Sequence, residues 1–292
     1  WMYDITVELA EELGQSLKIA RLYSNQSAQR VKQAMADGRV NPLHPAPPID
    51  DDLLDSCTGI VALAGSEQIQ VALNTGADIV LAGRTTDTAI IAALPLAEDA
   101  DAGGAWHGAK IGECGAFCTT DPRSGTIMVE FDPAGFSVQP LAKGVECTTH
   151  TVSAHMLYEN SDPFILYEPG GHLDVTGSHY VQKERGSVRV TGSKWVPSAD
   201  YTVKLEGSRI VGYQTVAMSI LRERRYVENV DQWVEGIENS VNGRIADNRI
   251  AQREEFDIEF RLVGRDSALG ELEAPIAPPR EIGVMAIVTA RS

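Results

Sequence analysis

Apolar residues near the start of the chain recur first at helical spacing and then at strand spacing. The pattern predicts a helix over residues 4–13, a strand over 17–23 and a second helix over 25–37. Helix, strand and helix in this order open many doubly wound α/β folds. The apolar stripe of the first helix is Ile5, Leu9 and Leu13.

The next segment gives the clearest α/β pattern in the chain. Residues 57–64 form an apolar run, 67–74 a helical pattern, 78–82 a second apolar run and 86–94 another helical pattern. Because strands that alternate with helices pair in parallel, we predict an open, mostly parallel doubly wound sheet over residues 1–122. A Gly-rich hinge before a further helix is expected near the end of this region.

After Pro122 the sequence pattern changes to short β-branched runs separated by Gly, Pro and Asp. This mixture predicts an α+β region with antiparallel strands over residues 123–292. Two helices interrupt the strands, over about 151–159 and 226–245. The expected strands cover residues 126–131, 188–191, 201–205, 210–218, 256–263 and 281–289.

Both ends of the sequence fall on predicted elements. The chain starts at Trp1 inside a helical pattern and stops at Ser292 directly after a strand-like run. We therefore expect further sequence beyond both ends, so that each predicted region is truncated at its outer end.

Charge and composition narrow the class of protein. The net charge is -16, from 25 Lys plus Arg against 41 Asp plus Glu. A surface this acidic disfavours nucleic acid and an anionic membrane as partners. The sequence shows no membrane-length apolar stretch, and its first residues show no basic region followed by an apolar one. Four cysteines in 292 residues do not make a disulfide framework, so we expect a cytoplasmic protein.

Gly83, Arg84 and Asp87 follow an apolar strand, at the place where ligands bind in open α/β sheets. The arginine fork suits a carboxylate or phosphate, and Asp87 is a candidate for proton transfer. The alternative is local: an Asp in the first turn of a helix is often a cap, and Arg84 then pairs with it.

Gly65, Ser66 and Glu67 follow the preceding strand in the same way. Free amides at such a turn can cradle an anion, which makes the segment a candidate for substrate binding. The alternative is that Ser66 is an ordinary N-cap. Arg265, at the end of a later strand, is a candidate second cation for the same substrate.

Acid–base and metal-binding candidates lie further along the chain. Glu113 is a candidate acid or base on the helix after the hinge, and His155 is a candidate base. Cys114 and Cys118 lack the second ligand pair of a zinc site, so buried thiols are expected. A divalent metal is a candidate cofactor, although each candidate ligand also has a structural reading, as a helix or turn pair. The candidate ligands are His155 with Glu159 and His172 with Asp174.

Several segments together resemble the acyclic terpene utilisation protein A family, whose members are called AtuA-like proteins. Motifs of serine elbows, Walker loops, zinc proteases and Rossmann glycines do not occur in the chain. The matching segments are residues 65–69, 76–87, 110–115, 153–163, 188–193 and 201–206. The resemblance implies a catabolic protein that is encoded with enzymes degrading branched or acyclic acids, often as acyl-CoA esters.

We therefore expect an enzyme that acts on a small carboxylate or acyl-CoA ester by lyase, hydratase or isomerase chemistry. Arg84 is expected to anchor the acid, and Asp87, Glu113 or His155 to move a proton. CoA then enters as part of the substrate. The alternative is a non-catalytic subunit that binds such a ligand or scaffolds a partner enzyme. A homo-oligomer is expected, and a small partner subunit is a second candidate partner.

Overall fold

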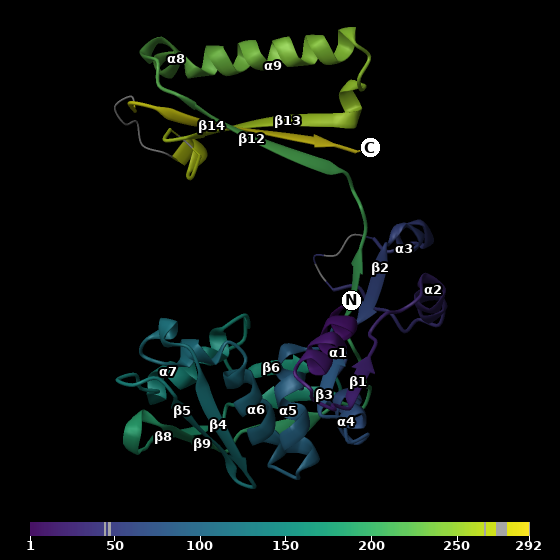
Figure 1. Ribbon diagram of the computed structural model, residues 1–292, viewed down its shortest axis with the longest axis vertical. Coiled ribbons are helices and arrows are strands. Elements are labelled where there is room, and N and C mark those ends of the chain that lie inside the picture. The colour runs from purple at the N-terminus through teal and green to yellow at the C-terminus, as the bar shows by residue number, and fades with distance from the viewer. Residues whose placement is uncertain (44, 46–47, 266, 273–278, 292) are drawn as a thin grey trace. The chain divides into compact units, whose positions relative to one another are not determined.

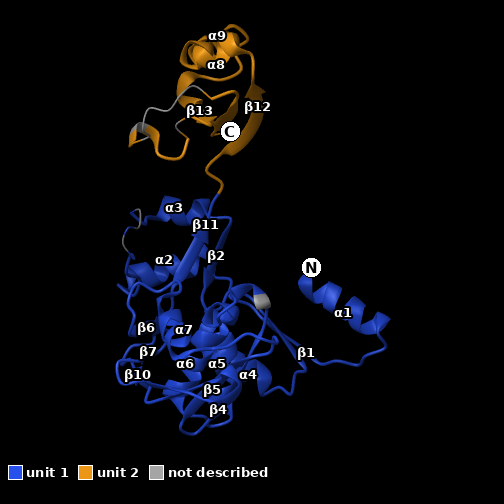
Figure 2. Cartoon of the chain, turned by 90° about the vertical axis from the view of Figure 1, so that its left-hand side faces the viewer, with its two compact units in different colours: residues 1–209 blue, residues 210–292 orange. Residues whose placement is uncertain are grey.

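The computed structural model describes residues 1–43, 45, 48–265, 267–272 and 279–291. The chain divides into two compact units, Trp1–Arg209 and Ile210–Ser292, called here the first and the second unit (Figure 2). The boundary predicted after residue 122, between the α/β region and the α+β region, lies inside the first unit. Each unit is described below by itself.

The first unit mixes short helices with short strands (Figure 1). Its α-helices are α1 (Met2–Glu12), α2 (Ala28–Ala36), α3 (Asp51–Ser56), α4 (Ser66–Leu73), α5 (Asp87–Ala97), α6 (Ala102–Gly112) and α7 (Thr149–Ala154). Its strands are β1 (Ile19–Leu22), β2 (Gly59–Ala62), β3 (Ile79–Ala82), β4 (Ile127–Asp132), β5 (Gly135–Pro140), β6 (Ile165–Glu168), β7 (Gly171–Asp174), β8 (His179–Gln182), β9 (Val188–Thr191), β10 (Lys194–Pro197) and β11 (Leu205–Ser208).

The prediction of an open, mostly parallel doubly wound sheet is wrong. Among the described strands the only parallel pair is β1 with β3, and β2 pairs antiparallel with β11 instead of joining them. The expected order of strands and helices is present, but each of these strands has four residues, and β11 occupies a ladder position beside β2. The other sheets of this unit are antiparallel, in the orders β4-β5-β9-β8 and β10-β7-β6.

Side-chain caps fix where the helices around the site begin. The Thr86 hydroxyl accepts the amide hydrogen of Ala89 at 3.1 Å and starts α5. The Asp101 carboxylate accepts the amide hydrogen of Gly104 at 2.6 Å and starts α6. The expected glycine hinge is therefore the first turn of α6. The helix also ends at Gly112, so Glu113 is its C-cap and not an interior residue.

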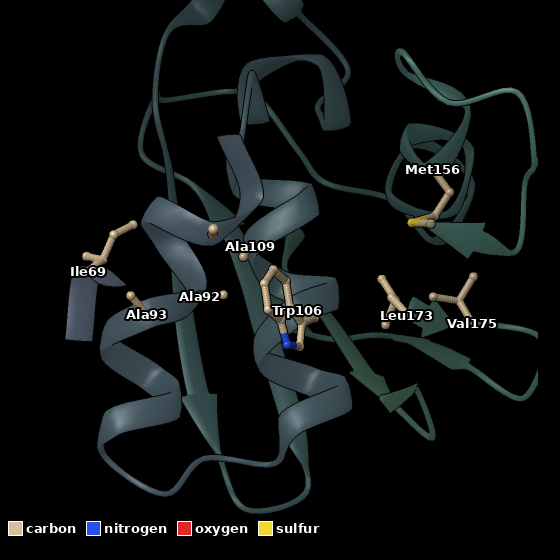
Figure 3. Close-up of a cluster of buried hydrophobic side chains, with 9 residues drawn as sticks. Ile69, Ala92, Ala93, Trp106, Ala109, Met156, Leu173 and Val175 are labelled. Atoms are coloured by element: carbon tan, nitrogen blue, oxygen red, sulfur yellow. The ribbon is translucent and has the colours of Figure 1, made fainter. Parts of the chain in front are cut away.

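Trp106 of α6 lies in a cluster of buried apolar side chains in the first unit (Figure 3). Its indole stacks on Trp195 with ring centroids 4.7 Å apart. Small residues on the facing helix α5 allow the two helices to approach closely. The buried members of the cluster are Ile69, Ala89, Ala92, Ala93, Trp106, Ala109, Met156, Leu173 and Val175.

Glycines let α6 lie against its neighbours almost without clearance. A Cβ atom added at Gly104 would stand 2.7 Å from the Cα of Gly135, and one at Gly108 would stand 2.5 Å from a ring carbon of Phe131. No real side chain fits at such distances. The close packing fixes the end of α6, and with it Lys110 and Glu113.

The second unit is an antiparallel three-stranded sheet with helices on one face (Figure 1). The strands are β12 (Tyr213–Leu221), β13 (Phe256–Val263) and β14 (Ile282–Ala290), with β14 in the centre, and the helices are α8 (Arg224–Glu228) and α9 (Val230–Asp247). Its own buried core consists of Val227, Val230, Leu262, Ile282 and Val284.

None of the helices within the described ranges combines the length and the apolar character that a membrane crossing needs.

Candidate functional site

A cavity of about 910 Å³ opens in the first unit and is called here the site cavity. One wall is apolar and comes from α2, α3, β2 and β11 and their flanks, with Val31, Leu53, Leu54, Ile60, Leu63 and Leu205 among its members. Other lining residues are polar and are called here the polar wall. Its members include Arg84, Thr85, Thr86, Asp87, Thr88, Lys110, Glu113, Glu159, Glu168 and Lys204. An apolar pocket with a few convergent polar groups is typical of ligand sites.

Arg84 lies in the loop between β3 and α5, where the sequence predicted an anion-binding cation. Its Nε and Nη2 donate to the Glu206 carboxylate at 2.9 and 3.3 Å. This hydrogen bonding, with a further contribution from Lys204, lowers the pKa of Glu206 to about 2. Arg84 remains 44% exposed on the cavity wall, so its guanidinium is still accessible to an anion.

Asp87 is the first residue of α5 and is also exposed on the cavity wall. Its carboxylate stands 3.8 Å from Nη1 of Arg84, a longer contact than the one Arg84 makes with Glu206. The side chain that caps α5 is Thr86. Asp87 is therefore not the helix cap, but the rest of the local reading holds, because Asp87 lies in the first turn of α5 and pairs with Arg84.

Gly83 brings two segments together beside Arg84. Its amide donates to the Leu22 carbonyl at 2.8 Å, and an added Cβ would stand 3.0 Å from the Ser24 hydroxyl. That hydroxyl in turn donates to the Arg84 carbonyl at 2.6 Å. Gly83 thus holds the Arg84 backbone against the end of β1.

Lys110 and Glu113 form a largely buried ion pair at the end of α6. Their side chains are 3% and 12% exposed. The Lys110 ammonium donates to the Glu113 carboxylate and, at 2.8 Å, to the Tyr158 carbonyl. The Thr88 hydroxyl donates to the second carboxylate oxygen of Glu113 at 2.9 Å. Sequence reasoning missed Lys110, although a Lys three residues before a Glu at the end of a helix of small residues was a usable signal.

Glu168 ends β6 and was also missed. Its Oε2 is buried and has no hydrogen-bond partner within the described part of the chain. Burial raises the pKa of this carboxyl to about 7, while the Thr86 and Thr88 hydroxyls act in the opposite direction. The signal in the sequence was a carboxylate at a strand end, directly before Pro169 and two glycines.

His155 contacts the backbone of Glu113. Its Nε2 is 3.1 Å from the Glu113 carbonyl, and its ring stacks on Tyr158. Burial lowers the pKa of His155, which keeps the imidazole neutral. It is not one of the described residues that line the site cavity. The predicted helical face shared by His155 and Glu159 does not form, because α7 ends at Ala154 and Glu159 has a positive φ of 52°.

The candidate metal ligands do not converge. His172 and Asp174 lie on β7, where the Asp174 carboxylate accepts the Thr176 amide hydrogen at 2.8 Å. Across the described residues, no group of three or more His, Cys, Asp or Glu side chains is arranged to hold a metal ion.

The remaining substrate-binding candidates lie outside the described lining of the site cavity. Gly65 is the N-cap of α4, and its amide already donates to Gln68 at 2.8 Å. Ser66 is buried as the first residue of α4, and Glu67 accepts the Tyr201 hydroxyl at 2.9 Å. Arg265 belongs to the second unit, where it donates to Asp231 at 2.6 Å.

A comparison with protein-family models identifies this chain. The model described as acyclic terpene utilisation family protein AtuA matches residues 2–290, nearly the whole chain. Comparisons with curated proteins and with solved structures give no match. The family match confirms the resemblance found in the sequence, and the chain belongs to the acyclic terpene utilisation family AtuA.

Proposed function

We propose that this protein is an enzyme of acyclic terpene catabolism that acts on a small carboxylate or its acyl-CoA ester. The reaction is acid–base chemistry of the lyase, hydratase or isomerase kind. The family match supports the catabolic context. The chemistry of the site cavity supports the proposed substrate class and reaction.

One observation carries the proposal: a single cavity joins an accessible guanidinium to a buried ammonium and carboxylate. Arg84 supplies a fork that matches a carboxylate or phosphate. Lys110 and Glu113 supply groups that hold or move a proton where water is scarce. An anion anchor and a buried acid–base group are what such reactions require.

The cavity wall repels an anionic substrate less than the chain as a whole does. The chain as a whole carries a net charge of -16, which repels anions at long range. The described lining residues carry five cationic side chains and four carboxylates, and Glu206 pairs with Arg84 and Lys204, so the wall is close to neutral. The cations are Arg39, Arg84, Lys110, Lys204 and Arg209, and the carboxylates are Asp87, Glu113, Glu159 and Glu168.

Arg84→Ala tests the anchor. We expect binding of the acids or acyl-CoA esters to weaken by about 10- to 100-fold, because a hydrogen bond to a charged group is lost. Isothermal titration calorimetry with a panel of branched acids and their CoA esters measures this. Arg189→Ala is the matched control, because Arg189 pairs with Asp132 at 2.7 Å and does not line the cavity as described.

The wild-type protein decides between the enzyme and its alternatives. Turnover of at least one member of the panel supports the enzyme. Binding without turnover, even with partner enzymes present, would instead favour a ligand-binding subunit. If no member of the panel binds, and Arg84→Ala disrupts only assembly with a partner, the scaffolding alternative replaces the proposal.

A further inference from the structure

Glu168 reaches the site cavity from a rigid part of the first unit. It is the last residue of β6, and the turn through Pro169 and Gly170 leads directly into β7. Glu168 pairs with Gly171 in the β6–β7 ladder. The backbone of Glu168 is therefore fixed by a hairpin, which suits a group that must hold one position during a reaction.

Lys110, Glu113 and Glu168 form a cluster of one cation and two carboxyl groups. Glu113 raises the pKa of Glu168 and Lys110 lowers it, so both act on this carboxyl. The ammonium of Lys110 is already bonded to Glu113. One buried cation cannot compensate two buried carboxylates, so the cluster favours a proton on one of them. Glu168 is the carboxyl that lacks a partner for one oxygen in the described structure.

A structural role would leave Glu168 fully bonded, because buried polar atoms in folded proteins nearly always have partners. Glu168 is one of the described residues that line the site cavity, and its buried Oε2 has no partner among the described residues. This oxygen can therefore accept a proton without breaking a hydrogen bond of the folded chain. Lys110 is similar, because an ammonium has three hydrogens and two of them are donated to Glu113 and Tyr158.

We propose that Glu168 is the catalytic residue that takes and returns a substrate proton, and that Lys110 stabilises the oxyanion formed in between. This inference rests on the proposed function and narrows its substrate to an acyl-CoA thioester. A thioester forms an enolate with one negative charge, which one ammonium can balance. A free carboxylate would have to form a dianion.

The step balances without any further reactant. The Glu168 carboxylate removes the proton on the carbon next to the thioester carbonyl, and the C–H electron pair becomes the C=C bond of the enolate. The carbonyl π electrons move onto the oxygen beside Lys110. The Glu168 carboxylic acid then exchanges its proton with solvent and protonates the same carbon, which gives hydrogen exchange, or it protonates the γ-carbon of a 3-enoyl chain, which gives the 2-enoyl isomer.

Deuterium exchange tests the step directly. The wild-type protein is incubated in heavy water with saturated and 3-enoyl branched acyl-CoA thioesters, and mass spectrometry follows deuterium in the acyl group. We expect wild-type exchange, a loss of about 100-fold or more in Glu168→Gln, and thioester binding within threefold of wild type. Glu130→Gln, on the exposed face of β4, is the control and should exchange as wild type does.

If Glu168→Gln does not fold, a second variant and a pH profile of the wild-type protein still test the proposal. Glu168→Asp keeps the charge but withdraws the carboxyl, so exchange should fall at least tenfold while the circular dichroism spectrum stays native. The wild-type rate should rise with pH and level off above about 7, because the carboxylate form is the base.

The outcomes separate this inference from the proposed function. Wild-type exchange in a folded Glu168→Gln protein overturns the role of Glu168, and so does a flat pH profile; the proposed enzyme stands in both cases. Turnover of free acids without exchange in any thioester overturns the substrate class alone. If no thioester or acid binds the wild-type protein, the proposed function fails and this inference fails with it.

Discussion

Three charge-bearing side chains, those of Lys110, Glu113 and Glu168, lie on the polar wall of the site cavity with little exposure to water. Burying charge is costly unless partners compensate it. Lys110 and Glu113 compensate each other, while Glu168 depends on staying protonated. The protonation state of one residue therefore contributes directly to the stability of the first unit.

The pH dependence of stability follows from the raised pKa of Glu168. This pKa is about 7 in the folded protein and 4.5 in an ordinary carboxyl of this type. Between these values the folded state holds the proton that the unfolded chain releases, so the free energy of unfolding falls as pH rises from 4.5 to 7. The expected loss is about 3 kcal/mol.

Glu168→Gln should remove this loss, because an amide does not titrate. Urea unfolding at pH 5 and pH 8 measures it: the wild-type protein should be less stable at pH 8, and the variant should show a smaller difference. An identical pH dependence in both proteins would mean that Glu168 is not held in its neutral form. Glu130→Gln again serves as the control.

At the scale of elements, α6 determines the geometry of the polar wall. The helix carries Lys110 in its last turn and is followed by Glu113, and glycines press it against β5 and its neighbours. Gly is a poor helix former, and it costs about 1 kcal/mol relative to Ala in a helix interior. Glycine nevertheless occurs in α6 at positions 104 and 108, because larger residues do not fit there.

Two glycine substitutions should therefore have opposite effects. Gly104→Ala places a Cβ atom 2.7 Å from the Gly135 backbone and should destabilise the first unit by about 1–3 kcal/mol through overpacking. Gly236→Ala in α9, where an added Cβ meets nothing within 4 Å, should stabilise the second unit by about 1 kcal/mol. Thermal denaturation measures both. A Gly104→Ala protein as stable as wild type would refute the packing argument.

Sequence patterns located most helices and strands but not their partners. Apolar periodicity is local, so β13, β14 and α5 lie within a few residues of their predicted ranges. Pairing is not local: β2 bonds to β11, which comes more than 140 residues later. The rule that alternating strands and helices form parallel sheets therefore failed here.

Sequence patterns likewise predicted some residues of the site cavity and missed others. Arg84 and Asp87 followed from their place after a strand, and the structure puts both on the cavity wall. Lys110 and Glu168 both interact with Glu113, and the sequence did not show this because only the folded chain brings β6 to the end of α6. His155 was predicted as a candidate base, but its ring contacts the Glu113 backbone and it is not among the described residues that line the cavity.

At the scale of the whole molecule, each unit has a hydrophobic core of its own. The described core of the second unit contains Leu262 and Ile282, whereas Val138 and Val190 belong to a core of the first unit. The described residues that line the site cavity all belong to the first unit. Stability and ligand binding should therefore be separable by substitutions in the two cores.

Leu262→Ala should destabilise the second unit by about 2–5 kcal/mol, because it removes a buried side chain and leaves a void. Binding of CoA esters in the first unit should not change. Val138→Ala is the reciprocal variant and should destabilise the first unit alone. Calorimetric melting and titration of the same samples measure both effects. Equal losses of melting temperature in both units after either substitution would contradict separate cores.

The size of the site cavity has a thermodynamic consequence for any occupant. A space of about 910 Å³ holds roughly thirty water molecules at their volume in the liquid. A ligand whose hydrocarbon part covers Val31, Leu54 and Ile60 must expel the water along that wall. Association should then carry a negative heat-capacity change, and its enthalpy should become more favourable on warming. A ligand held only by Arg84 would lack this signature.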